Sequence, residues 1–378
     1  MTLIAAGAIV LDDRVCRPGW LETSGRRIRD CGAGAPPRPA DVAFADSVVV
    51  PGFVDVHVHG GDGASYGDAR AAEIARAAEF HARHGTTTTL ASLVTASPAE
   101  LLTGVRALAE AAAAGLIAGI HLEGPWLSPA HPGAHDRDRL RDPDPAEIDA
   151  VLAAGAGAIR MVTLAPELHA SGRAIDRFLD ADVVVAIGHT DATYEQTKQA
   201  IAAGATVGTH VFNAMRPLHH REPGPAFALL EDPRVTVELI ADGVHVHPAL
   251  VRAVVEFAGP DRVALVTDAT AAAGLPDGSF RLGSLPVEVV SGVARVRNTA
   301  TIAGSTATMD RLFRAVADAH SDAALAAAVR MTSATPARVL GLDGVGVLRA
   351  GLDANLVVLD QDLRVTAVMA NGRWRVGR

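Results

Sequence analysis

The chain has only two cysteines, Cys16 and Cys31, among its 378 residues. Two thiols cannot build the disulfide framework of a small secreted domain, and they are compatible with the reducing cytoplasm, where we expect the protein. The first residues lack the basic segment of a secretory signal peptide. The apolar runs are shorter than the roughly 20 residues that a membrane-spanning helix needs, so we expect no membrane partner.

Basic residues are also few. The 34 lysines and arginines are outnumbered by 43 aspartates and glutamates, which leaves a net charge of −9 and no basic block. This balance argues against a nucleic acid as partner. Hydrophobic residues make up 49% of the chain, so it is long and apolar enough to bury a large core.

The two ends of the chain resemble each other in pattern. Short strands separated by turns are expected over residues 3–10, 15–22, 26–30 and 48–50, and again over 356–359, 365–370 and 373–376. Asn371-Gly372 is a strong signal for a tight hairpin turn. We therefore expect residues 1–50 and 345–378 to form one small β-sandwich together.

Between these ends, short apolar stretches alternate with alanine-rich amphipathic segments. Strands are expected over residues 86–90, 119–122, 159–164, 183–187, 206–209, 236–240 and 262–267. This alternation predicts a parallel sheet. About eight such units fit an α/β fold of the (β/α)8 TIM-barrel type, which we assign to residues 51–344. The alternative is an open doubly wound sheet, which fits less well because no G-x-G-x-x-G motif follows the first strand.

The first candidate site is the histidine pair in Pro51-Gly-Phe-Val-Asp-Val-His57-Val-His59-Gly60. Residues two apart on a strand share a face, so His57 and His59 are expected to point the same way. Two imidazoles at the end of a barrel strand can chelate a divalent metal ion.

Four further strands are followed by a possible ligand or proton-transfer group. These groups are Glu123, His189, His210 and Asp268. Each residue alone has a structural explanation, but all of them at strand ends in this order indicate a metal-dependent active site at the barrel mouth. His121 shares a strand with Glu123 and either supports the site or only packs beside it.

The remaining histidines carry weaker signals. A helix is expected around residues 73–83, with Ile74, Ala77 and His81 at helical spacing. His81 and His84 lie near its end, and we expect them at the surface or as capping groups.

The order of these groups resembles the amidohydrolase superfamily, and several motifs resemble its N-acetylglucosamine-6-phosphate deacetylase family. The motifs are Pro51-Gly-Phe-Val-Asp, His121-Leu-Glu-Gly-Pro-Trp, Gly188-His-Thr, Thr209-His-Val-Phe-Asn-Ala-Met, Arg221-Glu-Pro-Gly, Ala241-Asp-Gly-Val-His, Val266-Thr-Asp-Ala and Ala303-Gly-Ser. They occur in family order between residues 51 and 305, and the flanking segments also fit.

The resemblance implies one or two divalent metal ions per subunit. Glu123, His189 and His210 would hold the principal ion, and His57 and His59 would complete a second site with Glu123. Zinc is the expected metal, with iron, manganese, cobalt and cadmium as alternatives. Asp268 would be the general base and acid. Many superfamily members use a carboxylated lysine as bridging ligand, but Lys198 is the only lysine here and lies in a helical pattern beyond His189.

The resemblance also implies a substrate, an amino-sugar phosphate that would lose its acetyl group. The implied substrate-binding residues are Ala134, His135, Asn213, Ala214, Arg221, Asp242, His245, Ile302, Ala303 and Gly304. In the family, the residue matching Arg221 reaches the neighbouring active site of a homodimer. Another amide hydrolase or deaminase of the superfamily is the first alternative, and a non-catalytic barrel module is the second.

Overall fold

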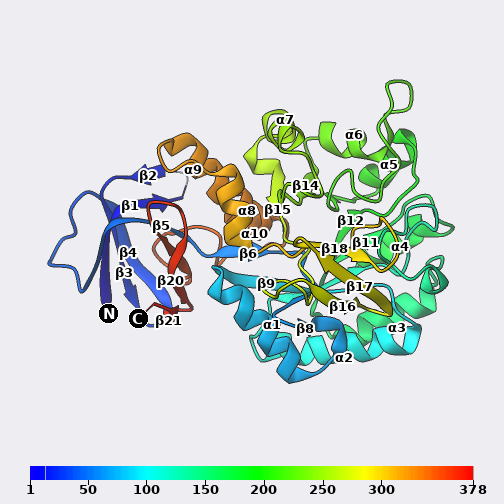
Figure 1. Cartoon of the computed structure of the whole chain (residues 1–378), viewed down its shortest axis with the longest axis horizontal. Helices are drawn as coiled ribbons and strands as arrows, with labels where there is room; N and C mark the ends of the chain where they lie inside the picture. The colour runs from blue at the N-terminus through cyan, green and yellow to red at the C-terminus, as the bar shows by residue number, and fades with distance from the viewer. Residues whose placement is uncertain (13, 378) are drawn as a thin grey trace. The chain divides into compact units, whose positions relative to one another are not determined.

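The computed structural model describes residues 1–12 and 14–377, and its elements are labelled in Figure 1. They fall into two compact units. One unit comprises Met1–Asp55, His81–Thr88 and Thr308–Arg378, and the other comprises Val56–Phe80 and Thr89–Ala307.

Strands from both ends of the chain form one sheet in the first unit. Its strands are β1 (Thr2–Leu11), β2 (Arg14–Cys16), β3 (Gly19–Ser24), β4 (Arg27–Ala33), β5 (Val42–Pro51), β19 (Leu356–Leu359), β20 (Val365–Ala370) and β21 (Arg373–Val376). They lie in the order β21-β20-β19-β5-β1-β3-β4, and β2 pairs with β1. The antiparallel pairing of β19 with β5 joins the two ends, as the sequence pattern predicts.

This sheet curves around its own core. Ile28 of β4 and Met369 of β20 belong to strands near opposite edges, yet both lie in the same buried cluster with Ile9 and Val49. The hairpin between β20 and β21 turns at Asn371 and Gly372, both with positive φ, which matches the expected turn type.

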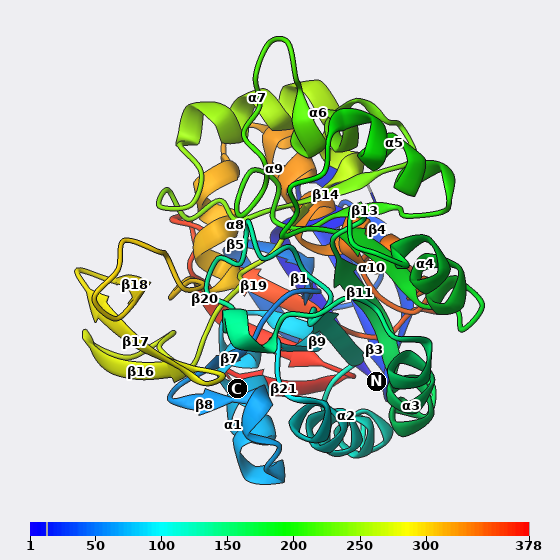
Figure 2. The ribbon, with the colours of Figure 1, turned by 90° about the vertical axis from the view of Figure 1, so that its right-hand side faces the viewer.

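The second sheet is the barrel, which is viewed towards its mouth in Figure 2. Its eight strands are β6 (Phe53–Asp55), β9 (Thr86–Leu93), β10 (Gly119–Glu123), β11 (Ile159–Leu164), β12 (Val184–Ile187), β13 (Val207–Gly208), β14 (Thr236–Leu239) and β15 (Val263–Leu265). Neighbours from β9 to β15 pair in parallel and in chain order. The expected (β/α)8 architecture is confirmed.

Backbone hydrogen bonds of the segment after β6 bring the first and last strand ends together. The amide of Asp268 donates to the His57 carbonyl at 2.8 Å, and the amide of Ser92 donates to the Val58 carbonyl at 2.9 Å. The histidine pair is therefore held between the ends of β9 and β15.

Helices alternate with the barrel strands. They are α1 (Ala71–Arg83), α2 (Pro98–Ala113), α3 (Pro145–Gly155), α4 (Ser171–Leu179), α5 (Tyr194–Ala202), α6 (Gly224–Glu231) and α7 (Pro248–Ala258), and α8 (Met309–Val316), α9 (Asp322–Val329) and α10 (Thr335–Val339) follow. Reciprocal capping bonds fix the start of two helices, between Ser97 and Glu100 in α2 and between Thr193 and Gln196 in α5.

Two small sheets border the mouth. A short hairpin pairs β7 (Gly60–Gly61) with β8 (Ala64–Ser65). A three-stranded antiparallel sheet consists of β16 (Gly278–Leu282), β17 (Leu285–Val290) and β18 (Val293–Val296), and the sequence analysis did not predict it.

The expectation for His81 is wrong. This side chain is fully buried, because it lies on the same stripe of α1 as the buried Ile74 and Ala77. His84 is partly exposed, and its Nδ1 lies 3.2 Å from Asp310 Oδ1.

Candidate active site

All the candidate ligands follow the carboxyl ends of barrel strands. Glu123 is the last residue of β10, and His189 and His210 lie two residues after β12 and β13. Asp268 lies three residues after β15. The histidine pair differs from expectation, because β6 ends at Asp55 and His57 and His59 lie in the irregular segment that follows.

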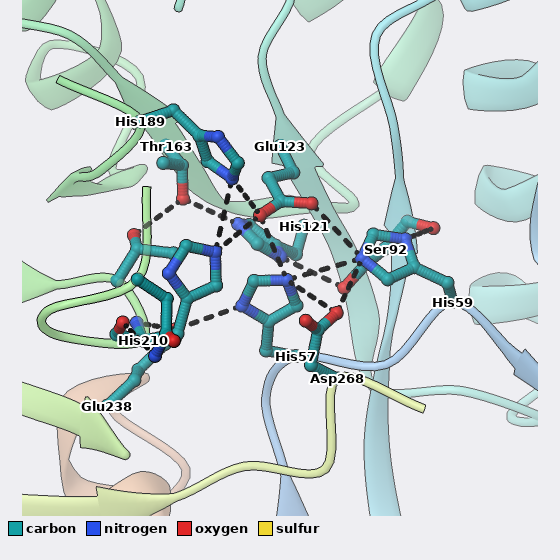
Figure 3. Close-up of polar contacts among 12 residues, drawn as sticks. His57, His59, Ser92, His121, Glu123, Thr163, His189, His210, Glu238 and Asp268 are labelled. Atoms are coloured by element: carbon teal, nitrogen blue, oxygen red, sulfur yellow. Dashed lines mark hydrogen bonds and ion pairs between the residues drawn. The ribbon is translucent and has the colours of Figure 1, made fainter. Parts of the chain in front are cut away.

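Glu123 lies at the centre of the first group of contacts (Figure 3). Its Oε1 lies 3.1 Å from His189 Nε2 and 3.0 Å from His210 Nε2. The two ring nitrogens are 3.2 Å apart. One oxygen and two nitrogens thus converge on a common point.

A second group shares the same carboxylate. His59 Nε2 lies 3.1 Å from Glu123 Oε2, and His57 Nε2 lies 3.4 Å from Glu123 Oε1. Asp268 Oδ1 is 3.2 Å from His59 Nε2 and 3.6 Å from His57 Nε2. The expected alignment of the histidine pair is confirmed, since the two Nε2 atoms are 3.3 Å apart.

In three of these histidines, the Nδ1 atom, which faces away from the centre, contacts an oxygen atom that can accept a hydrogen bond. His57 Nδ1 lies 3.0 Å from Glu238 Oε2, His59 Nδ1 lies 3.2 Å from the Ser92 carbonyl, and His189 Nδ1 lies 3.1 Å from the His131 carbonyl. Because these oxygens only accept, each Nδ1 carries the proton. Each Nε2 therefore faces the centre and can give its lone pair to a metal ion that takes the place of a proton there, as in histidine ligands of metal ions.

Glu238 is a further site residue, which the strand-end pattern did not predict. It lies on β14 and is fully buried, and its Oε2 contacts both His57 and the backbone amide of His210. A carboxylate within a buried strand needs a partner, so the acidic residue inside Thr236–Leu239 was the available signal.

His121 lies in the layer beneath the site. Its two ring nitrogens contact Ser92 Oγ at 2.9 Å and Thr163 Oγ1 at 2.8 Å. The sequence left open whether His121 supports the site or only packs beside it. Because both of its ring nitrogens contact side chains in this buried layer, His121 supports the site.

Three of the candidate ligands and proton-transfer groups adopt left-handed backbone conformations. The φ angles are 47° for His189, 24° for His210 and 47° for Asp268. Such conformations are costly for residues other than glycine and cluster at functional sites. They turn the chain sharply after each strand, which directs these side chains across the barrel mouth.

The pKa values of the two central carboxyl groups, Glu123 and Asp268, are lowered. Burial alone would raise the pKa of Asp268, but the hydrogen bond with His59 and the charge of His57 lower that pKa to about 2. Burial would likewise raise the pKa of Glu123, but the electrostatic interactions with His57 and His135 bring this pKa well below its usual value. Both groups are therefore ionised at neutral pH, ready to hold a cation or accept a proton.

The ligand spacing fits a divalent metal ion. Two donors bound tetrahedrally at about 2.0–2.1 Å lie about 3.3 Å apart, close to the separations around Glu123 Oε1. Ring nitrogens this close repel each other unless a cation or a proton lies between them. His57 and His59 form a second possible group with Glu123.

A cavity of about 260 Å³ opens above these ligands. Of the expected substrate-binding residues, the ones that line it are Ala134, His135, Asn213, Ala214, His245, Ile302 and Gly304. The side chain of His245 is held by Asp242, whose Oδ2 lies 2.8 Å from its Nδ1.

Three expected substrate-binding residues do not line this cavity: Asp242, which instead holds His245, and Ala303 and Arg221. Ala303 is fully buried and packs in a cluster with Leu282 and Ala134. Arg221 is exposed, in the turn closed by His219 and Glu222, and among the described residues it is not one of those that line the cavity. Lys198 lies on α5 and pairs with acidic groups outside the site.

Known proteins match the chain over nearly its whole length. It matches the Amidohydrolase family over residues 48–375. It is 37% identical over 362 residues to the N-acetylgalactosamine-6-phosphate deacetylase of Escherichia coli O157:H7, covering 94% of this chain and 95% of that relative. It is 32% identical over 381 residues to the N-acetylglucosamine-6-phosphate deacetylase of Bacillus subtilis (strain 168), covering 98% and 96%.

A solved structure agrees with this relationship. The N-acetyl-D-glucosamine-6-phosphate deacetylase from Mycobacterium smegmatis, an aspartate-to-alanine mutant in complex with N-acetyl-D-glucosamine-6-phosphate, superposes with a TM-score of 0.97. Its sequence is 55% identical, and 99% of each chain is covered. The resemblance seen in the motifs is confirmed: the chain belongs to the amidohydrolase family, on the branch that contains the N-acetylglucosamine-6-phosphate deacetylases.

Proposed function

We propose that the protein hydrolyses N-acetyl-D-glucosamine 6-phosphate to D-glucosamine 6-phosphate and acetate, in amino-sugar breakdown or recycling. The main support is the convergence of Glu123, His189 and His210 next to an ionised Asp268 at the barrel mouth. The names of the relatives supply the substrate class.

A divalent ion held by Glu123, His189 and His210 would lower the pKa of a bound water to about 7 and polarise the acetyl carbonyl. The Asp268 carboxylate accepts the proton of the attacking water. It then returns this proton to the amine, which is a poor leaving group unless it is protonated. Histidine and carboxylate ligands suit zinc, which we propose as the metal, with His57 and His59 available for a second ion.

Other residues that line the cavity would recognise the sugar phosphate. Burial would lower the pKa of His245, but the contact with Asp242 raises it, which favours the protonated imidazole that can donate to a phosphate or a hydroxyl group. Asn213 also lines this cavity. We propose that the protein forms a homodimer in which Arg221 binds the phosphate group of the substrate in the neighbouring subunit's active site. Arg221 is exposed and does not line the cavity of its own subunit.

The cellular setting remains part of the proposal. Cys16 and Cys31 are both free, which suits the cytoplasm. Among the described helices, none is both long and apolar enough to cross a membrane.

The decisive experiment measures acetate release and metal content together. N-acetylglucosamine 6-phosphate, its galactosamine epimer and the unphosphorylated sugars are offered to protein of known metal content. We expect turnover of a phosphorylated substrate that disappears on chelation and returns when zinc is added. Turnover in metal-free protein would refute the mechanism, and preference for an unphosphorylated amide would favour another activity of the superfamily.

A further inference from the structure

A second cavity lies next to the catalytic one. Its volume is about 860 Å³, and its lining shares two residues with the catalytic cavity, His59 and Leu282. His59 is fixed by contacts with the Ser92 carbonyl and with the carboxylates of Glu123 and Asp268. Leu282 contributes only apolar packing at the end of β16. The part of the shared wall that can be changed without touching the metal ligands is therefore Leu282.

The direction of the acyl group follows from the planarity of the amide. In a trans amide, the substituent on nitrogen and the substituent on the carbonyl carbon lie on opposite sides of the C–N bond. The reacting carbonyl has to lie beside Asp268 and its contact His59, and His59 belongs to the wall that the two cavities share. With the sugar held by residues that line only the smaller cavity, such as Asn213 and His245, the acyl methyl group lies on the side of the shared wall, which Leu282 completes.

The surface next to Leu282 is apolar, although the larger cavity is also lined by charged side chains such as Glu100, Arg139 and Arg281. Leu282 is 7% exposed and packs with Ala134, which also lines the catalytic cavity. Behind Leu282, the lining of the larger cavity includes apolar side chains, among them Val94, Leu101 and Phe280. Val94 and Phe280 pack against the same cluster as Leu282. A longer acyl chain would meet apolar surface there if Leu282 were smaller.

We propose that Leu282 limits the length of the N-acyl group that the enzyme removes, and that the cavity behind it accepts longer acyl chains once this side chain is shortened. The proposal rests on the proposed deacetylase activity. It assigns acyl selectivity to β16–β18, which contributes none of the proposed metal ligands.

The test compares N-acetyl, N-propionyl and N-butyryl glucosamine 6-phosphate as substrates of the zinc-loaded protein. In the wild type, kcat/KM is expected to fall with each added methylene. In Leu282→Ala, the ratio of kcat/KM for the propionyl substrate to that for the acetyl substrate is expected to rise by about 10- to 200-fold, the usual effect of one methylene in an apolar pocket.

Val287→Ala is the matched control. Val287 is 1% exposed and lies in the same cluster on the adjacent strand, but it is not one of the residues that line either cavity among those described. Its ratio should equal that of the wild type. Thermal unfolding monitors each variant, and Leu282→Val, with a smaller rise in the ratio, replaces Leu282→Ala if the latter does not fold.

Each outcome decides a different point. An unchanged ratio in the folded Leu282 variant, or an equal rise in Val287→Ala, overturns the assignment of acyl selectivity to Leu282. A wild-type protein that hydrolyses none of the three substrates overturns the proposed function, and the acyl selectivity with it.

Discussion

At the scale of single residues, the proposed chemistry depends on the carboxylate of Asp268. It lines the catalytic cavity and contacts His59, and its low pKa keeps it ionised. An asparagine has nearly the same shape but cannot accept the proton of the attacking water. This contrast separates a catalytic role from a structural one.

We expect Asp268→Asn to lower kcat by about 10²- to 10⁴-fold, the usual contribution of a general acid–base group. Metal content should stay close to that of the wild type, because Glu123, His189 and His210 are intact. Steady-state kinetics together with elemental analysis check both points. A near-normal kcat would remove Asp268 from the proposed mechanism.

Glu238 offers a second test at this scale, since it contacts His57 from behind. Glu238→Gln should weaken metal binding at the site of His57 and His59 by about 10- to 100-fold, the usual cost of losing a group that orients a ligand. Titration with zinc against a competing chelator measures this. Glu256→Gln on the exposed face of α7 is the control, and equal affinities in both variants would contradict the role of Glu238.

The candidate ligands could be predicted from the sequence because each one follows an apolar strand, where a barrel places its active site. Glu238 could not be recognised as their partner. Its contact with His57 spans 181 residues, and one sequence does not tell which strand residue faces inwards. His81 was wrongly expected at the surface for a related reason. From the sequence alone, a histidine on the apolar stripe of a helix can be either a helix-capping group or a buried core residue.

At the scale of secondary-structure elements, the start of α8 depends on one buried acid. Burial would raise the pKa of Asp310, but hydrogen bonds with His84, Thr308 and Arg314 lower it well below its usual value. A carboxyl group with a lowered pKa stabilises the fold above its unfolded-state pKa of about 3.9. This stabilisation is lost as the pH falls below that value.

We therefore expect Asp310→Asn to destabilise the protein by about 1–3 kcal/mol at pH 5, the cost of losing a buried charged partner. The difference in Tm from the wild type should shrink at pH 3. Thermal unfolding at both pH values tests this, with the exposed Asp46→Asn on β5 as control. A difference that grows on acidification would show that the ionised carboxyl does not stabilise this region.

The sequence of the sheet β16–β18 carries a recognisable strand pattern. Leu285–Val290 alternates in burial, and Ser291-Gly292 supplies a turn with positive φ at both residues. The strands and helices of the barrel were predictable because they recur eight times. The sheet β16–β18 occurs once, as an insertion in this alternation of strands and helices. Its contact with the catalytic cavity through Leu282 depends on tertiary packing, which no local pattern encodes.

At the scale of the whole molecule, the open question is whether two chains share their active sites. Arg221 is exposed in a tight turn, and its Nη1 lies 2.8 Å from His220 Nε2. A guanidinium in this position is free to meet a phosphate group presented by another chain. The proposed homodimer can therefore be tested through catalysis.

Arg221→Met should reduce kcat/KM for the phosphorylated substrate. The loss of transition-state stabilisation should be about 1.5–3 kcal/mol, the value of a hydrogen bond to a charged group. Turnover of unphosphorylated N-acetylglucosamine should hardly change. Mixed dimers of Arg221→Met and Asp268→Asn chains should regain one intact site each, which acetate release detects. A purified mixed dimer without recovered activity would place Arg221 in the site of its own chain.

The left-handed backbone at His189, His210 and Asp268 has a consequence for protein engineering. Grafting these side chains onto another barrel with ordinary strand ends would leave them aimed in other directions, however well their chemistry was copied. A transplant that succeeds must carry the three bends along with the side chains, and the host must supply the stability that holds them. Conversely, a designer who wishes to remove the activity while keeping the barrel can relax these bends and leave the strands untouched.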